Sequence, residues 1–218
     1  MVSSTSASPT NSIPIPIKII FSEEVTGFDS LDVSLSNALL SGFTGSKDVY
    51  AFQLNPIAPG DMTVKIPANA AKDTTGNRNL ESTTFTIRYT TVPSVVISSS
   101  VDSITNISTI PMKVTFSKNV TGFIATDIII SNGTLTQFSG SGADYNFNLE
   151  PTSDGNVTVN INANVASDSD ANGNYGAQQF SIIYDKTSPK VTISTTAESP
   201  TQLTLIPISL EFTESVVG

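Results

Sequence analysis

The sequence predicts an all-β protein made of tandem β-sandwich domains, and three observations carry this prediction. The chain repeats itself, since Phe21, Phe116 and Phe212 lie 95 and 96 residues apart in matching surroundings. Apolar residues alternate with a period of two inside each copy, as they do in half-buried strands. Turn-forming segments separate these alternating runs about every 8 to 12 residues. No segment has a sustained 3.6-residue apolar period, so we expect essentially no helix.

The aromatic residues show the repeat most clearly. All 11 phenylalanines, and every tyrosine except Tyr175, recur at equivalent positions of the copies. Because each copy must bury the same face, a residue that recurs in every copy is most simply a core residue. The aromatic residues are therefore interpreted as part of the structural core and not of a binding site. The equivalent sets are Phe21, Phe116 and Phe212, then Phe28 and Phe123, Phe43 and Phe138, Phe52 and Phe147, Phe85 and Phe180, Tyr50 and Tyr145, and Tyr89 and Tyr184.

The clearest strand is the alternating run from Ile15 to Phe21, which recurs from Ile110 to Phe116 and from Ile206 to Phe212. A proline recurs near the start of each run, at Pro16, Pro111 and Pro207. Proline within a sheet is tolerated at an edge, a bulge or a strand start. We therefore expect this strand to begin, or to switch sheets, near its proline.

Four further strands are expected in each copy, separated by turns such as Pro59–Asp61 and Asp154–Asn156. About seven short strands in roughly 95 residues is typical of an immunoglobulin-like sandwich. The fold class predicted is thus all-β, with tandem immunoglobulin-like β-sandwich domains. The strands lie at Val33–Leu35, Tyr50–Leu54, Met62–Ile66 and Phe85–Tyr89, and at Ile128–Ile130, Tyr145–Leu149, Val157–Ile161 and Phe180–Tyr184.

The copies divide the chain into three predicted domains. Residues 1–93 form the first repeat, with its first strand truncated, residues 94–188 form the second, and residues 189–218 begin an incomplete third. The linkers Tyr89–Pro93 and Tyr184–Pro189 are short and end in proline, which restricts their conformations more than a Gly/Ser chain would. Aligning the copies with one another also predicts that the chain is an excerpt of a longer protein, whose sorting signals lie outside it.

Composition excludes several classes of function. The chain has no cysteine and no histidine, which removes thiolate metal sites and both Ser-His-Asp and Cys-His catalysis. Its net charge is −9, the wrong sign for binding a phosphate backbone, so we expect no nucleic-acid partner. No stretch of about 18 apolar residues is present, so we expect no membrane insertion in this segment.

Several motifs resemble the bacterial Ig-like repeats of large secreted and surface-anchored adhesins, and together they cover the whole chain. They are Phe21–Glu23, Val25–Phe28, Asp32, Asp73–Asn77, Phe116–Ser117, Val120–Phe123, Asp127, Gly173–Asn174 and the junction Asp185–Pro189. The resemblance implies a secreted or cell-surface stalk with neighbouring repeats as partners, sometimes with calcium at loops and junctions. Two departures stand out: Thr90 occupies the position of Asp185, and Lys118 that of Glu23.

The loop from Asp168 to Asn174 carries the candidate metal site. It matches the opening D-x-D-x-N-G of a calcium loop, in which alternate side-chain oxygens converge on a hard cation. The predicted calcium ligands are Asp168, Asp170, Asn172 and Asn174. The alternative is a plain Asn/Gly-rich turn, since Gln179 stands where such a loop has its bidentate glutamate.

Other polar positions have structural explanations. Asp32 and Asp127 recur before a strand and are interpreted as Asx-turns or caps. Glu23 and Glu24 are adjacent, so their side chains should point to opposite faces and form no catalytic pair. Ile206–Phe212 is an apolar strand that could pair with another chain.

The function predicted is a non-enzymatic spacer array of an extracellular or cell-surface adhesin-like protein. One alternative is a module that binds a cell-surface glycan or protein through the loops around Asp170 and Tyr175. Another is an accessory spacer of a secreted polysaccharide-degrading enzyme.

Overall fold

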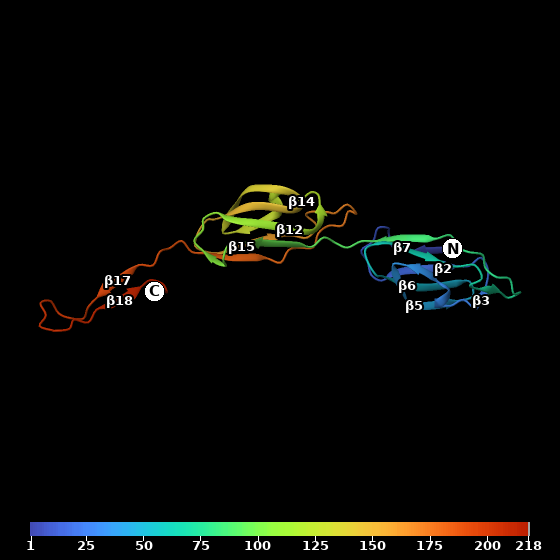
Figure 1. Ribbon diagram of the computed structural model, residues 1–218, viewed down its shortest axis with the longest axis horizontal. Coiled ribbons are helices and arrows are strands. Elements are labelled where there is room, and N and C mark those ends of the chain that lie inside the picture. Colours follow the sequence, from blue (N-terminus) through green and yellow to red (C-terminus); the bar gives the residue numbers. More distant parts are fainter. Residues whose placement is uncertain (218) are drawn as a thin grey trace. The chain divides into compact units, whose positions relative to one another are not determined.

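The computed structural model describes residues 1–217, whose regular structure is almost entirely β-strand (Figure 1). Within these residues the helical elements are two single 3-10 turns, η1 (Ser30–Asp32) and η2 (Ala125–Asp127). Neither has the length or the apolarity to span a membrane. The all-β prediction is confirmed.

The first repeat is built from two main antiparallel sheets. One has the strand order β1-β2-β6-β5 and the other the order β4-β7-β9, while β3 and β8 form a separate short pair. The bounds are β1 (Val2–Ser4), β2 (Ile15–Ile20), β3 (Val25–Thr26), β4 (Ser34–Ser36), β5 (Ala38–Ser46), β6 (Val49–Pro56), β7 (Gly60–Lys65), β8 (Lys72–Asp73) and β9 (Phe85–Tyr89).

Strand alternation places the predicted residues in the core of the first repeat. Ile15, Ile17 and Ile19 on β2 are all buried and lie opposite Leu54, Phe52 and Tyr50 on β6. At one end of this core the rings of Phe21 and Phe28 meet edge to face, with centroids 5.1 Å apart. Edge-to-face pairs contribute roughly 0.5–1.5 kcal/mol beyond the burial of their area.

The second repeat has two sheets with the orders β10-β12-β14 and β11-β16-β15-β13. The segment assigned to β14 corresponds to β5 and β6 of the first repeat together with the turn that joins them. Gly140 lies at this turn with a positive φ, and a side chain there would collide with the backbone of Asp144. The bounds are β10 (Val95–Ser99), β11 (Ile104–Thr105), β12 (Ile110–Val120), β13 (Ile128–Ser131), β14 (Gly133–Pro151), β15 (Gly155–Ile161) and β16 (Phe180–Tyr184).

The recurring prolines lie where the sequence predicts. Pro16 and Pro111 are the second residues of β2 and β12, so each stands at a strand start. The third copy contributes a hairpin of β17 (Val191–Ser194) and β18 (Ser209–Phe212). Its alternating apolar residues Ile206, Ile208, Leu210 and Phe212 are between 44% and 61% exposed, as expected for an apolar strand without a core beneath it.

Contacts group the chain into two compact units that do not follow the repeat boundaries. The first unit holds Met1–Ser94 together with Phe116–Phe123 and Ala163–Tyr175, and the second holds the remaining residues. The end of β12 and the loop between β15 and β16 thus group with the first repeat and the linker after it. The domain limits at residues 93 and 188 therefore stay a prediction.

Candidate functional site

The candidate loop, Asp168–Asn174, lies between β15 and β16. Backbone N–H groups later in the loop donate hydrogen bonds to its first residue, Asp168. Asp168 is 8% exposed, and its Oδ1 accepts hydrogen bonds from the backbone N–H groups of Asp170 and Asn172, each at 3.0 Å. The N–H of Ala171 donates to the carbonyl of Asp168 at 3.0 Å. This is the geometry of an Asx-turn, in which a carboxylate takes over backbone donors.

The side chain of Asn174 binds the backbone just before the loop. Its side chain is 1% exposed, and its Oδ1 accepts the N–H groups of Val165 and Ala166 at 3.0 and 2.9 Å. In the first repeat Asn79 does the same for the N–H of Ala71 at 2.7 Å. Because both repeats use this amide in the same way, Asn174 belongs to the scaffold.

Asp170 faces the linker that follows β9. The hydroxyl of Thr90 donates to Asp170 Oδ2 at 3.0 Å, and Arg88 Nε lies 3.5 Å from Asp170 Oδ1. Asn172 Nδ2 donates to Thr90 Oγ1 at 3.3 Å. Thr90 is 3% exposed, so its buried hydroxyl is satisfied by these partners, whereas the Asp170 and Arg88 side chains keep 22% and 52% exposure.

Lys118, near the end of β12, completes this cluster. Its Nζ donates to Asp168 Oδ2 at 3.0 Å and to Thr90 Oγ1 at 3.4 Å, and it also donates to the carbonyl of Thr91. Burial is the strongest influence on the pKa of Asp168 and raises it. The hydrogen bonds from Lys118, Asn172 and Asp170 together outweigh burial and leave that pKa below its ordinary value.

The arrangement does not fit a calcium ion as folded. Calcium takes about 6–8 oxygen ligands at about 2.3–2.6 Å. Here both Asp168 oxygens accept N–H donors, the Asn174 oxygen accepts two more, and Asp170 faces Thr90 and Arg88. Within residues 1–217 no three acidic side chains gather closely enough to hold a metal. Calcium at Asp168, Asp170, Asn172 and Asn174 stays a prediction, and a titration of the chain tests it.

The first repeat carries the equivalent loop around Asp73. Its carboxylate accepts the backbone N–H groups of Thr75 and Asn77, each at 2.8 Å, and the side-chain amide of Asn77 at 2.8 Å. These bonds, the Asn77 amide first, lower the pKa of Asp73 to about 2. Both repeats thus stabilise this loop with an ionised aspartate.

Acid should therefore destabilise the first repeat through Asp73. Since its pKa falls from 3.8 to about 2 on folding, its contribution is present above pH 4 and is lost as pH falls towards 2. We expect the melting temperature of Asp73→Asn to change less across this range than that of the wild type, measured by circular dichroism. Glu81→Gln, which alters the exposed partner of Lys65, is the control. Equal acid sensitivity in wild type and Asp73→Asn contradicts this expectation.

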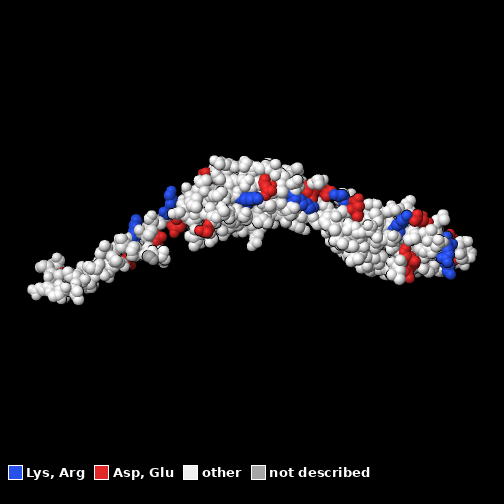
Figure 2. Space-filling view, viewed as in Figure 1, with Lys and Arg blue, Asp and Glu red and all other residues white. Residues whose placement is uncertain are grey.

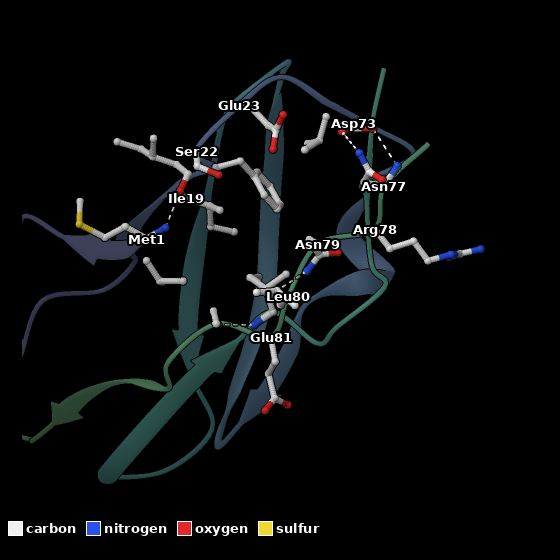
Figure 3. A pocket seen from close by; sticks show the side chains of 16 residues that line it. Met1, Ile19, Ser22, Glu23, Asp73, Asn77, Arg78, Asn79, Leu80 and Glu81 are labelled. Carbon is white, nitrogen blue, oxygen red and sulfur yellow. Dashed lines mark hydrogen bonds between the residues drawn. The ribbon is translucent and has the colours of Figure 1, made fainter. Parts of the chain in front are cut away.

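A cavity of about 400 Å³ lies beside the Asp73 loop. Figure 3 shows Glu23 and Asp73 at its rim, while Arg78 and Glu81 extend away from it. Glu23 lines this cavity, whereas Glu24 pairs with Lys47 at 2.9 Å. The two adjacent carboxylates thus have different surroundings, as expected for neighbouring residues whose side chains point to opposite faces.

The recurring aspartates Asp32 and Asp127 are caps, as predicted. Asp32 Oδ2 accepts the N–H of Asp29 at 2.8 Å, and Asp127 Oδ2 accepts the N–H of Ile124 at 2.9 Å. Each carboxylate closes one 3-10 turn before the next strand. On the face displayed in Figure 2, acidic and basic side chains lie interspersed among a majority of uncharged residues.

Three members of the cluster around the loop could not be placed there from the sequence: Arg88, Thr90 and Lys118. One signal pointed to two of them, because Thr90 and Lys118 are the positions at which the first junction departs from the other copies. The structure shows that these two departures are in contact with each other.

The comparison with protein-family models agrees with this architecture. A family model described as a bacterial Ig-like domain matches residues 1–89 and again residues 89–183. No curated protein matches the chain. Among solved structures, invasin, a bacterial integrin-binding protein, is 11% identical with a TM-score of 0.31. The match covers 90% of this chain and 42% of invasin, so the chain spans less than half of that protein.

Proposed function

This chain belongs to the bacterial Ig-like domain family, and from that premise we propose that it is a non-enzymatic spacer array of an adhesin-like protein. Its units are residues 1–93, 94–188 and the start of a third at 189. Its partners are neighbouring repeats, and its place is outside the cell or on its surface. Its task is to hold a binding region away from its anchor while limiting bending at the junctions.

The observation that carries this proposal is the fixed linker after β9. Thr90 N–H donates to the carbonyl of Thr10 at 2.9 Å, which ties the start of the linker to the first repeat. At the other end, Tyr175 N–H donates to the carbonyl of Pro93 at 2.8 Å, and Ser117 N–H donates to that of Ser94 at 2.9 Å. A linker with both ends bonded in this way is a spacer element, unlike a flexible Gly/Ser tether.

The core supports the same function. The aromatic positions that recur between copies fill the interiors of the sandwiches, as Phe52 and Phe147 do at 1% and 2% exposure. The recurring acidic positions Asp32, Asp73 and Asp168 accept backbone N–H groups and hold turns. The residues that the repeats share therefore maintain structure.

Pulsed electron-spin distance measurements test the spacer function directly. The chain has no cysteine, so Ser46→Cys and Ser141→Cys, at equivalent exposed positions of the two repeats, accept one spin label each. We expect a single narrow distance distribution, as wide as that of a control pair within one repeat, Ser46→Cys with Thr84→Cys. A broad distribution, typical of a freely jointed chain, would rule out a stiff spacer.

A second candidate function is recognition of a cell-surface glycan or protein at Tyr175. This tyrosine is 61% exposed and follows the candidate loop, so its ring is available for stacking on a sugar face. The binding function predicts saturable binding on a glycan array that is lost in Tyr175→Ala while the fold survives. If the wild type and Tyr175→Ala give equal binding profiles on the glycan array, recognition at Tyr175 is ruled out and the spacer function is the remaining proposal.

A further inference from the structure

The ammonium of Lys118 lies where oxygens from separate parts of the chain converge. Asp168 Oδ2, Thr90 Oγ1 and the carbonyl of Thr91 all accept from Nζ. A lysine ammonium has three N–H donors and no acceptor, so these oxygens match its donors in number. The Asp168 side chain is 4% exposed and that of Lys118 is 30% exposed, so solvent screens this pair far less than an exposed one.

At two positions of this junction, a residue that is acidic in another copy is replaced by one without negative charge. Where Lys118 stands, the first and third copies have Glu23 and Glu214, and where Thr90 stands, the second junction has Asp185. One carboxylate is thus replaced by an ammonium and the other by a neutral hydroxyl. Both replacements remove negative charge that an external cation would otherwise neutralise, and the two new side chains contact each other at 3.4 Å.

We propose that Lys118 is the built-in cation of this junction and holds the linker to the Asp168 loop in place of a metal ion. A calcium ion bound to Asp168 Oδ2 would lie beside the ammonium, and the like charges would repel each other strongly because solvent screens this site only weakly. The junction therefore keeps its linker fixed when calcium is absent. This inference concerns the chemistry of the junction and is independent of the role proposed for the array.

Amide hydrogen exchange of the full chain, followed by NMR, tests the proposal. The N–H groups of Tyr175 and Ser117 report on the linker because they donate to the carbonyls of Pro93 and Ser94. In the wild type we expect their exchange to be equally slow in millimolar calcium and in chelator. In Lys118→Met, which keeps the apolar stem and removes the donors, we expect exchange about tenfold faster, which corresponds to about 1.4 kcal/mol of local opening.

Matched variants separate this effect from a general loss of stability. Lys113→Met changes a lysine on the same strand whose 2.9 Å pair with Asp144 includes no linker residue, so both reporter amides should exchange as in the wild type. Lys118→Arg keeps the charge and should retain slow exchange. The core amides of β15 should be unchanged in all variants.

Two results would overturn the proposal. One is exchange of the Tyr175 and Ser117 amides that slows in the wild type when calcium is added, because a metal ion would then hold the linker. The other is exchange in Lys118→Met that equals the wild-type rate. The wild-type comparison needs no variant, so a linker held by a metal ion would be detected even if Lys118→Met folds poorly.

Discussion

Replacing Phe52 by alanine is expected to lower the free energy of unfolding of the first repeat by about 3–5 kcal/mol. Phe52 lies on β6, is 1% exposed and is paired in register with Ile17 of β2. Its ring stacks on Phe43 with centroids 6.4 Å apart, so truncation leaves a cavity that its neighbours cannot fill. Domains of this size have about 5–15 kcal/mol of stability, so this loss leaves the repeat marginal.

Urea denaturation of the full chain, read separately for each repeat, measures this effect. The control is Leu31→Ala, which removes a side chain that is 92% exposed and should change stability by less than about 0.5 kcal/mol. A loss below about 1 kcal/mol in Phe52→Ala would contradict the core described here.

Replacing Asp168 by alanine is expected to cost about 3 kcal/mol and to destabilise the second repeat most. Breaking a buried ion pair by removing one partner typically costs about 3–5 kcal/mol. We expect the lower end of this energy range because the Lys118 side chain is still 30% exposed to solvent. The N–H groups of Asp170 and Asn172 also lose their acceptor, and unsatisfied donors add to the cost.

Asp144→Ala is the matched comparison in the same repeat. Asp144 pairs with Lys113 at 2.9 Å, but both side chains are more than half exposed. Exposed pairs contribute about 0–1 kcal/mol, so we expect a small change in the urea midpoint. If Asp168→Ala loses no more stability than Asp144→Ala, the Asp168 loop is not the structural element that its hydrogen bonds indicate.

The fold could be predicted because its signals are local and occur twice. The alternation of Ile15, Ile17 and Ile19 with outward residues defines β2, and the same alternation recurs in β12. Pro16 and Pro111 marked the strand starts correctly, whereas in the third copy Pro207 precedes β18, which begins at Ser209. Strand pairing could not be read in detail: that β4 joins β7 and β9 while the next strand, β5, joins the other sheet depends on contacts between segments distant in the sequence.

The site could be predicted only in part, because its chemistry is not local. The D-x-D-x-N-G pattern located the loop, but the same residue spacing serves a calcium loop and an Asx-turn equally well. What distinguishes them is which groups approach from elsewhere. Lys118 is 50 residues from Asp168, and Thr90 is 80 residues from Asp170, so no local pattern reveals these contacts.

Single-molecule stretching of the full chain tests most directly the claim that independent folded repeats form a spacer. A force applied through the termini should unfold the two complete repeats in two separate steps. Each step should release about 300 Å of chain, since roughly 90 residues extend to at most about 3.3–3.6 Å each. Two steps of this length support a load-bearing array of tandem sandwiches. A single step that releases the whole chain, or gradual extension without steps, would contradict it.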